Sequence, residues 1–471
     1  MPMPQCASPR LDKKGLAGCP HCSNMIPPRH RHQCEVVPNI CSFNGTLWPV
    51  EKRRPLQRQQ LQRLRHLRVR SPVYSHHELS LKELHPLRPP EPGSATEKLL
   101  RRSYSAAAPN GFSECLPLVW LPVWPKNFFE SFIASVAPIF ELLDAGLITR
   151  DVLLRPDFGW KSRLPGYRHV AFFSETLQPM SSTALRSFAE EAPQCAPEAA
   201  ERTLRGGGAG SECTVQCYRH LLFCQFRSIY DYKQRYAKPF APFRTAQWIA
   251  ARAIGLSSAD GLPGRGLGGW RVTFVNRSRT SMLCDGCVSR ANLGEELGGN
   301  ENIRNLGELT QVCASVPPRA ECRAHEFGRR GLAADVAVAQ SSDVLIGTHG
   351  AGLLNCLFMP HGSAVLEVRL FGFEGKWPDA YLPALLRIER AIMFFKISTG
   401  DPSLVHPPPP AHATGWLARN GRDVTVPPRT LADALRTIFW ANRSMYSYEA
   451  LPHAFVSWAC VHHACEQSET F

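Results

Sequence analysis

Residues 332–368 read LAADVAVAQSSDVLIGTHGAGLLNCLFMPHGSAVLEV and form the most regular stretch of the chain. The spacing of apolar residues predicts a helix over Leu332–Gln340 and a buried strand over Val344–Gly347. A glycine-bearing turn follows, then a helix that begins at Ala351 and a second strand over Ala364–Val368. Strands that alternate with helices in this way predict a parallel sheet covered by helices.

The same alternation extends outward on both sides of this stretch. Upstream, apolar residues three or four positions apart predict a helix from Phe128 to Ala145, which Gly146 ends as a C-cap. The glycine-rich segment 261–269 separates two blocks of strands and helices. We therefore expect an α/β fold with two Rossmann-like halves. Further elements are expected at 151–154, 170–173, 220–225, 243–254, 272–275, around 308, at 424–426 and at 430–442.

Composition divides the 471 residues into four parts. Residues 1–110 are basic, rich in Pro and Arg and without sustained periodicity, which predicts a disordered extension. Residues 111–260 and 261–445 are the expected Rossmann-like domains, and residues 446–471 form a tail with Cys and His. The net charge of +14 suits acidic partners. Eight Lys or Arg lie between Lys52 and Arg70, so much of this charge is local.

The cysteine count leaves the cellular compartment open. Seventeen cysteines would stay reduced in a cytosolic enzyme, but in the secretory pathway they would largely pair and leave at least one free. Sequons at Asn44, Asn276 and Asn442 permit a luminal location, although such tripeptides arise often by chance. The N-terminus has no apolar stretch of signal-peptide type, and the longest apolar run, 116–125, is too short to span a bilayer. The sequence thus shows neither a signal peptide nor a transmembrane segment.

The segment G-T-H-G-A-G-L-L-N at 347–355 is the candidate ligand-binding segment of the chain. Glycines at 347, 350 and 352 allow a sharp turn and a close approach to a ligand, and a helix that begins near Ala351 would direct N–H groups at an anion such as a diphosphate. His349 could donate to a phosphate oxygen or take part in proton transfer. The alternative is a tight strand-to-helix turn without a ligand.

The surrounding residues resemble glycosyltransferase family 61, which includes plant xylosyl- and arabinosyltransferases and animal O-linked N-acetylglucosaminyltransferases. That family shows G-x-H-G-A-G-L-x-N, then L-F-x-P-x-G, then an acidic residue that closes the next strand. These elements fall on Gly347–Asn355, Leu357–Gly362 and Glu367. Weaker similarity covers residues 127–140 and the segment V-T-F-V-N-R-S-R with R-N-L-G-E-L, so the resemblance spans about 116–442.

The resemblance implies a GT-B-like fold, in which two Rossmann-like domains face each other across a cleft. It implies inverting transfer of xylose, arabinose or N-acetylglucosamine from a UDP-sugar to a hydroxyl on a glycan or glycoprotein. No cofactor or metal would be required, because arginines and a helix end can offset the diphosphate charge. The implied catalytic residues are Glu130 and His349. The implied donor-binding residues are Arg277, Arg279, Asn305, Glu308, His349, Gly350, Ala351, Gly352, Asn355 and Glu367.

The resemblance further implies a location in the Golgi or endoplasmic reticulum lumen, and nucleic acid is not an expected partner of such an enzyme. The sequence leaves the oligomeric state, the donor sugar and the acceptor open. Two Cys-x-x-C pairs, at Cys19 and Cys284, could hold zinc, but their spacing fits no standard site.

Departures from the family pattern affect the first helix and the arginines. Glu130 and Ala134 stand where the family has His and Asp, although Glu130 could still serve as a general base. Glu301 stands where an arginine is expected, and Arg290 or Arg304 could substitute. A catalytically inactive relative is therefore the alternative hypothesis. Such a protein would be a binding module whose basic N-terminal region contacts nucleic acid or an anionic surface.

Overall fold

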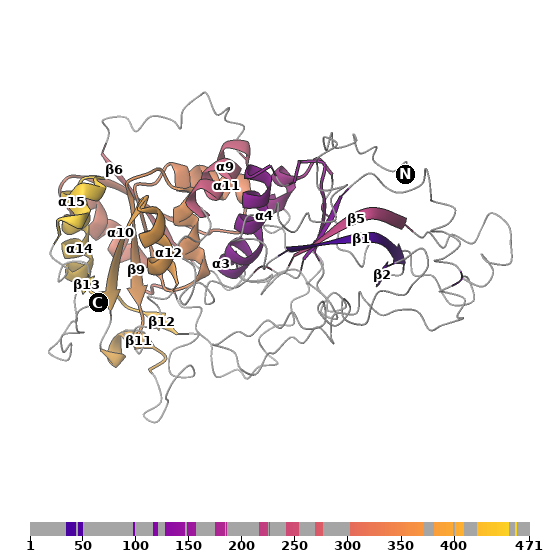
Figure 1. Ribbon diagram of the computed structural model, residues 1–471. Helices are drawn as coiled ribbons and strands as arrows, with labels where there is room; N and C mark the ends of the chain where they lie inside the picture. The colour runs from indigo at the N-terminus through magenta and orange to yellow at the C-terminus, as the bar shows by residue number, and fades with distance from the viewer. Residues whose placement is uncertain are drawn as a thin grey trace. The chain divides into compact units, whose positions relative to one another are not determined.

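The protein is described from a computed structural model, in which the chain forms two compact units (Figure 1). The first unit takes residues 1–126, 133–170 and 177–236, and the second takes residues 127–132, 171–176 and 237–471. The structure describes residues 34–43, 46–49, 98, 116–120, 128–146, 148–156, 175–183, 185, 216–224, 226, 242–253, 269–276, 302–371, 381–398, 401–408, 422–451, 457 and 458.

The first unit is built on a mixed five-stranded sheet of order β2-β1-β5-β3-β4. Its strands are β1 (Cys34–Phe43), β2 (Thr46–Pro49), β3 (Pro117–Trp120), β4 (Leu153–Pro156) and β5 (Gln216–Cys224). β3 pairs in parallel with β4 and β5, whereas β1 pairs antiparallel with β2 and β5. A Rossmann-like half would be all parallel around its centre, so the expected Rossmann-like character holds only for the β4-β3-β5 part.

The strands β1 and β2 lie within the segment that the sequence analysis assigned to a disordered extension. β1 is held by a ladder to β5 in which Cys41 lies directly opposite Cys217, and these two cysteines form a disulfide. They are 176 residues apart, so local composition does not reveal that this strand has a partner. The expectation of disorder is therefore wrong for residues 34–43 and 46–49.

The helix predicted over Phe128–Ala145 is confirmed, with a change of winding inside it. It consists of α3 (Phe128–Ser131), the π-helical turn η5 (Phe132–Val136) and α4 (Ala137–Asp144), and the division between the units falls inside this run. Gly146 follows with φ +68, a conformation that glycine adopts without steric cost, and its N–H donates to the carbonyl of Leu143. A short 3-10 turn, η7 (Gln178–Met180), completes the described helices of this unit.

The second unit contains a six-stranded parallel sheet of order β13-β10-β9-β8-β6-β7. The strands are β6 (Trp270–Val275), β7 (Ala320–His325), β8 (Val344–Thr348), β9 (Ser363–Arg369), β10 (Ile392–Ser398) and β13 (Ser457–Trp458). From β6 the chain runs to β7 on one side and then returns to form β8 on the other side of β6. This is the doubly wound topology that the alternation of strands and helices predicted.

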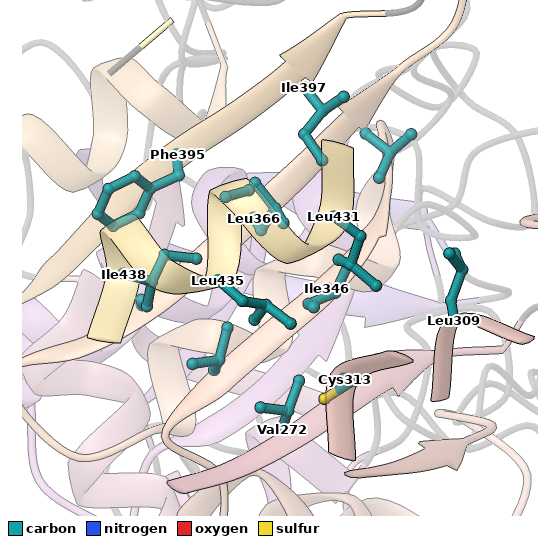
Figure 2. Close-up of a cluster of buried hydrophobic side chains, with 14 of the residues drawn as sticks. Val272, Leu309, Cys313, Ile346, Leu366, Phe395, Ile397, Leu431, Leu435 and Ile438 are labelled. Atoms are coloured by element: carbon teal, nitrogen blue, oxygen red, sulfur yellow. The ribbon is translucent and has the colours of Figure 1, made fainter. Parts of the chain in front are cut away.

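One face of this sheet is covered by α10 (Leu306–Ser315) and α14 (Pro428–Ala441), with α15 (Met445–Glu449) beside α14. Figure 2 shows α14 across the strands with Leu431, Leu435 and Ile438 among sheet residues such as Leu366 and Phe395. Leu435 is fully buried, and a buried leucine contributes about 1.5–3 kcal/mol relative to an exposed one. This helix is one of the main contributors to the apolar core.

A separate set of helices packs together around the segment that follows β8. These are α9 (Pro242–Ala253), α11 (Leu332–Gln340) and η10 (Ala351–Phe358), with α3 against η10. α9 belongs to this unit, so the unit begins before the boundary expected at residue 260. The remaining described elements are α12 (Leu382–Glu389), η12 (Pro402–Leu404) and the pair β11 (Val405–His406) and β12 (Asp423–Val424).

The predicted positions of α9, β6, α10, α11, β8 and β9 are confirmed to within about two residues, but one prediction about their type is wrong. The segment from Ala351 is a 3-10 helix of eight residues and not an α-helix. Its N–H groups close shorter rings, as the bond from Leu353 N–H to the Gly350 carbonyl shows. The strand expected at 170–173 lies outside the described residues.

Candidate functional site

The candidate site lies at the carboxyl edge of the parallel sheet, next to the point where the strand order reverses. β6 and β8 are neighbours in the sheet, and the chain leaves them on opposite sides. In open α/β sheets, ligands bind outside the carboxyl ends of strands at such a switch point. His349 follows β8 directly, and Asn276 follows β6. The topology therefore places the glycine-bearing turn where this fold class binds ligands.

Three charged or titratable side chains form a hydrogen-bonded chain at this edge. His349 Nδ1 lies 2.6 Å from Glu367 Oε1, and Arg369 Nε donates to Glu367 Oε2 over 2.7 Å. Side chains alternate along a strand, so Glu367 and Arg369 share a face of β9. Glu367 pairs with Gly347 across the ladder, so His349, two residues beyond Gly347, can reach its carboxylate. Both oxygens of Glu367 are thus engaged.

Burial makes this chain of contacts strong. The side chains of Glu367 and Arg369 are 1% and 0% exposed, and that of His349 is 14% exposed. Burial by itself raises the pKa of Glu367. The hydrogen bond from His349 and the charges of His349 and Arg369 outweigh burial, so the pKa of Glu367 is lowered from its ordinary value of 4.5. Glu367 is therefore a carboxylate at neutral pH.

The geometry changes the role expected of Glu367. The resemblance implied a direct contact between this carboxylate and the donor. The carboxylate is buried and accepts from both His349 and Arg369, so it orients the His349 ring. The imidazole nitrogen on the opposite side of the ring, Nε2, is then the atom through which His349 would contact a ligand. Arg369 was not among the expected site residues.

The glycines of the turn serve different purposes. Gly350 has φ +144, which L-residues with a side chain rarely adopt, so the turn itself requires glycine. Gly347 is required by packing, since an added Cβ would lie 2.9 Å from Cβ of Val275 and 3.1 Å from Cδ2 of Leu353. Glycine at 347 therefore lets β8 approach β6 closely, rather than leaving room for a ligand as the sequence analysis expected.

The residues after Gly350 form a partly exposed rim over a buried base. His349, Gly350, Ala351 and Gly352 are half-buried, whereas residues 353–359 are buried. Asn355 is 4% exposed, and its side-chain amide donates to the carbonyl of Gly352 over 2.9 Å. Asn355 thus holds the turn in shape. A ligand at this edge would meet the turn at residues 349–352.

The far end of η10 is held by a pair of glutamines that the sequence analysis did not single out. Gln247 Nε2, on α9, donates to the carbonyls of Leu357 and Met359 over 2.8 and 2.9 Å. Gln340 Nε2, at the end of α11, donates to Gln247 Oε1 over 3.1 Å and to the Phe358 carbonyl. These bonds satisfy the last carbonyls of η10, which the helix itself cannot. They also fix the position of the L-F-x-P motif.

Aromatic rings surround the same segment. Phe358 stacks on Phe128 with ring centroids 6.4 Å apart and meets Phe132 edge-on at 6.1 Å. Tyr381, which precedes α12, lies edge-on to His349 with centroids 6.0 Å apart and also contacts Phe129. These contacts explain the two phenylalanines of α3, because Phe128 packs against η10 and Phe129 packs against Tyr381. Tyr381 lies close enough to His349 to limit the movement of its ring.

Asn305 and Glu308 lie at the start of α10, and the structure gives Asn305 a structural role. Its amide nitrogen donates to the Val426 carbonyl over 2.8 Å, and its oxygen accepts from Val426 N–H over 3.1 Å. The same nitrogen also donates to Glu308 over 2.9 Å. Asn305 therefore ties the start of α10 to the segment before α14. Glu308 and Arg304 are exposed, and no contact to His349 is found for either among the described residues.

Several expected site residues cannot be placed. Arg277, Arg279, Arg290 and Glu301 lie outside the described residues, as do both Cys-x-x-C pairs. Glu130 lies on α3, but its side chain is outside the description, whereas Ala134 is fully buried. In the described part of the chain, no three His, Cys, Asp or Glu side chains are grouped to hold a metal ion. Likewise, no helix within the described ranges is long and apolar enough to cross a membrane.

Comparison with known proteins finds relatives of the part of the chain that contains this site. A family model described as Glycosyltransferase 61 matches residues 171–366, which include β6, β8, η10 and most of β9. Over 67 residues, the chain is 34% identical to the EGF domain-specific O-linked N-acetylglucosamine transferase of Xenopus laevis. This match covers 14% of the chain and 13% of the relative, so the chain spans about an eighth of the length of that relative. Over residues 171–366 the chain is thus similar to glycosyltransferase family 61.

Proposed function

We propose that the chain is a glycosyltransferase that moves a sugar from a UDP-sugar to a hydroxyl acceptor, with inversion at the anomeric carbon. The observation that carries the proposal is the pairing of His349 with the buried carboxylate of Glu367 at the carboxyl edge of β8. The family match, which includes His349 and ends one residue before Glu367, supports it. The name of the Xenopus laevis relative favours N-acetylglucosamine among the xylose, arabinose and N-acetylglucosamine donors considered.

His349 would act as a cationic hydrogen-bond donor to the diphosphate. With a protonated imidazole, the group formed by His349, Glu367 and Arg369 carries one net positive charge, since the carboxylate offsets one of two cations. As the anomeric C–O bond breaks, negative charge grows on the leaving diphosphate, and a fixed donor stabilises that charge. The backbone at Gly350–Gly352 would lie against the same oxygens.

The acceptor side of the reaction rests on the family resemblance. The acceptor hydroxyl would attack the anomeric carbon from the face opposite the diphosphate and pass its proton to a base, for which Glu130 is the candidate. A GT-B arrangement, with the first unit presenting a glycan or glycoprotein acceptor, is part of this proposal. The proposal also includes a location in the Golgi or endoplasmic reticulum. It further includes a reaction without a metal, in which Arg277 and Arg279 would assist His349.

A thermal-shift titration of the full chain with UDP, UDP-xylose, UDP-arabinose and UDP-N-acetylglucosamine tests donor binding. A ligand at one hundred times its Kd stabilises the folded state by about 2.7 kcal/mol. We expect His349→Ala to abolish the shift, because it removes the proposed donor to the diphosphate. His361→Ala is the matched control, since His361 is exposed at the other end of η10. Absence of a shift with every nucleotide would refute the donor site.

Transfer itself is tested with Glu130→Gln. This variant should lose transfer of a labelled sugar while keeping the thermal shift with UDP. Retained turnover would rule out Glu130 as the base.

A second candidate function is an inactive binding module, which the buried Ala134 favours because the family has an Asp at that position. Donor binding without transfer to any acceptor would support this second function. If nucleic acid or anionic vesicles bind and their affinity falls steeply with salt, the basic N-terminal region is supported as the binding surface. The full chain should be used, because β1 pairs with β5 and is joined to it by a disulfide.

A further inference from the structure

Two large apolar side chains of the described residues are exposed, one on each side of the turn between α14 and α15. They are Trp440, 61% exposed at the end of α14, and Tyr446, 84% exposed on α15. Aromatic rings exposed on both sides of a turn offer apolar area that a group attached to the turn can cover. Between them in the sequence lies Asn442, the first residue of the tripeptide Asn442-Arg443-Ser444. The two exposed aromatic residues therefore flank a sequon for N-linked glycosylation in the sequence.

The turn presents Asn442 outward and holds it there. Asn442 is the C-cap of α14 with φ 48 and ψ 47, and its N–H donates to the Phe439 carbonyl. Its side chain is exposed, and no hydrogen bond of its amide is found among the described residues. The next residue, Arg443, anchors the turn from inside, because its Nε donates to Asp343 over 3.0 Å and its guanidinium lies 4.3 Å from the Trp270 ring centroid.

These contacts of Arg443 also locate the turn on the sheet. Asp343 immediately precedes β8 and Trp270 begins β6, so the turn lies at the amino edge of the parallel sheet. His349 and the glycine-bearing turn lie at the opposite, carboxyl edge. A bulky group on Asn442 would leave the carboxyl edge accessible. By contrast, a group on the sequon asparagine Asn276 would stand at the carboxyl end of β6.

The disulfides indicate a compartment in which such a modification occurs. Cys41 is bonded to Cys217 in the first unit, and Cys313 to Cys322 in the second. Disulfides of this kind persist in the secretory pathway and are rare in the cytosol. The cysteine count of the sequence left this choice open. Two disulfides that join separate elements in both units favour the oxidising compartment.

We propose that Asn442 carries an N-linked glycan whose first sugars cover the rings of Trp440 and Tyr446. The side-chain nitrogen of Asn442 forms a bond to the anomeric carbon of an oligosaccharide carried on a lipid pyrophosphate. The bond between that carbon and the pyrophosphate oxygen breaks, the lipid pyrophosphate leaves, and the amide nitrogen releases one proton. The C–H face of a pyranose ring is apolar, so it can pack on an indole or phenol ring.

Expression of the full chain behind a secretory leader in animal cells tests the site. Peptide N-glycosidase in ¹⁸O-water should convert Asn442 to ¹⁸O-labelled Asp, which peptide mass spectrometry detects. Asn442→Gly keeps the left-handed backbone and should lose one glycan-sized step in gel mobility. Ser444→Thr, which preserves both the sequon and a capping hydroxyl, should keep that step. Unmodified Asn442 in the secreted protein would overturn the proposal, and translation with microsomes gives the same readout if secretion fails.

The packing on the aromatic rings has its own test. Removal of the glycan should lower the Tm of the wild type by about 2–4 °C, the shift expected from contacts of ordinary strength in a domain of this size. The double variant Trp440→Ala, Tyr446→Ala should show no such fall. An equal fall in the wild type and the double variant would refute the ring contact. Neither test depends on donor binding or sugar transfer, so both are independent of the proposed function.

Discussion

Replacing Glu367 with glutamine keeps the shape of this side chain and removes its charge. Glu367 is 1% exposed and lies between His349 at 2.6 Å and the fully buried Arg369 at 2.7 Å. The variant leaves the Arg369 charge buried without its counter-charge, and loss of one partner from a buried pair costs about 3–5 kcal/mol. At about 2–4 °C per kcal/mol, we expect the Tm to fall by roughly 6–20 °C.

The same substitution should also change the proton on His349. A glutamine that accepts from Arg369 through its oxygen turns its NH₂ group toward His349 Nδ1. That nitrogen must then accept, so the ring is neutral and no longer offers a positive charge to a diphosphate. UDP binding should weaken even at temperatures where the variant is fully folded, as measured by calorimetry.

The matched control is Glu449→Gln, which makes the same chemical change in an exposed pair with Arg390. We expect no measurable change in Tm for this control, because exposed ion pairs contribute little. A Glu367→Gln variant with a Tm within about 1 °C of the wild type would refute the buried charge network.

The lowered pKa of Glu367 determines whether the free energy of unfolding rises or falls with pH. The unfolded carboxyl titrates near 4.5, and the folded carboxyl titrates lower, with burial opposing the shift and His349 and Arg369 causing it. A depressed folded pKa contributes stability above the unfolded value, and this contribution is lost as the pH falls through the folded value. The difference in unfolding free energy between the wild type and Glu367→Gln should therefore shrink well below pH 4.5. A difference that is constant or grows in acid would contradict this sign.

Three further predictions concern the scaffold of the second unit. Gly347→Ala should lower the unfolding free energy by about 1–3 kcal/mol, since its Cβ would lie 2.9 Å from Val275. Leu435→Ala should cost about 2–5 kcal/mol in urea unfolding, whereas Arg436→Ala, an exposed neighbour, should change it by less than about 0.5 kcal/mol. Loss of the Cys313–Cys322 disulfide in a double Ser variant, over a separation of 9 residues, should cost about 2–3 kcal/mol, and an unchanged midpoint would refute this.

Local sequence patterns were sufficient for the order of elements in the second unit. Helix Leu332–Gln340 and the strands at 344 and 364 recur in the structure close to their predicted bounds, because periodicity reports which face of an element is buried. The same patterns placed His349 after a buried strand. They failed for the segment from Ala351, whose 3-10 winding is accompanied by bonds from Gln247 and Gln340 to the carbonyls at its far end.

Patterns failed more widely in the first unit. β1 pairs antiparallel with β5, and their bonded cysteines are 176 residues apart in the sequence. Pairing over such a distance leaves no local periodic signal, so the sequence predicted a disordered basic extension at β1. The sequence pointed to Gly347 as a position that needs glycine, but the reason it suggested was the approach of a ligand. Its cause is the side chain of Val275 on a neighbouring strand, which becomes evident only from the packing.

The sequence by itself determined that the second unit is a parallel α/β sheet and that the turn at 347–355 belongs to its carboxyl edge, since both follow from short-range spacing and the family motif. The tertiary structure alone decided that the Glu367 carboxylate accepts from both His349 and Arg369. It also placed the turn with Asn442 at the amino edge and left Trp440 and Tyr446 exposed on either side of that turn in the sequence. These contacts join residues that are far apart in the sequence. They form only when the strands and helices that hold those residues become neighbours in the fold.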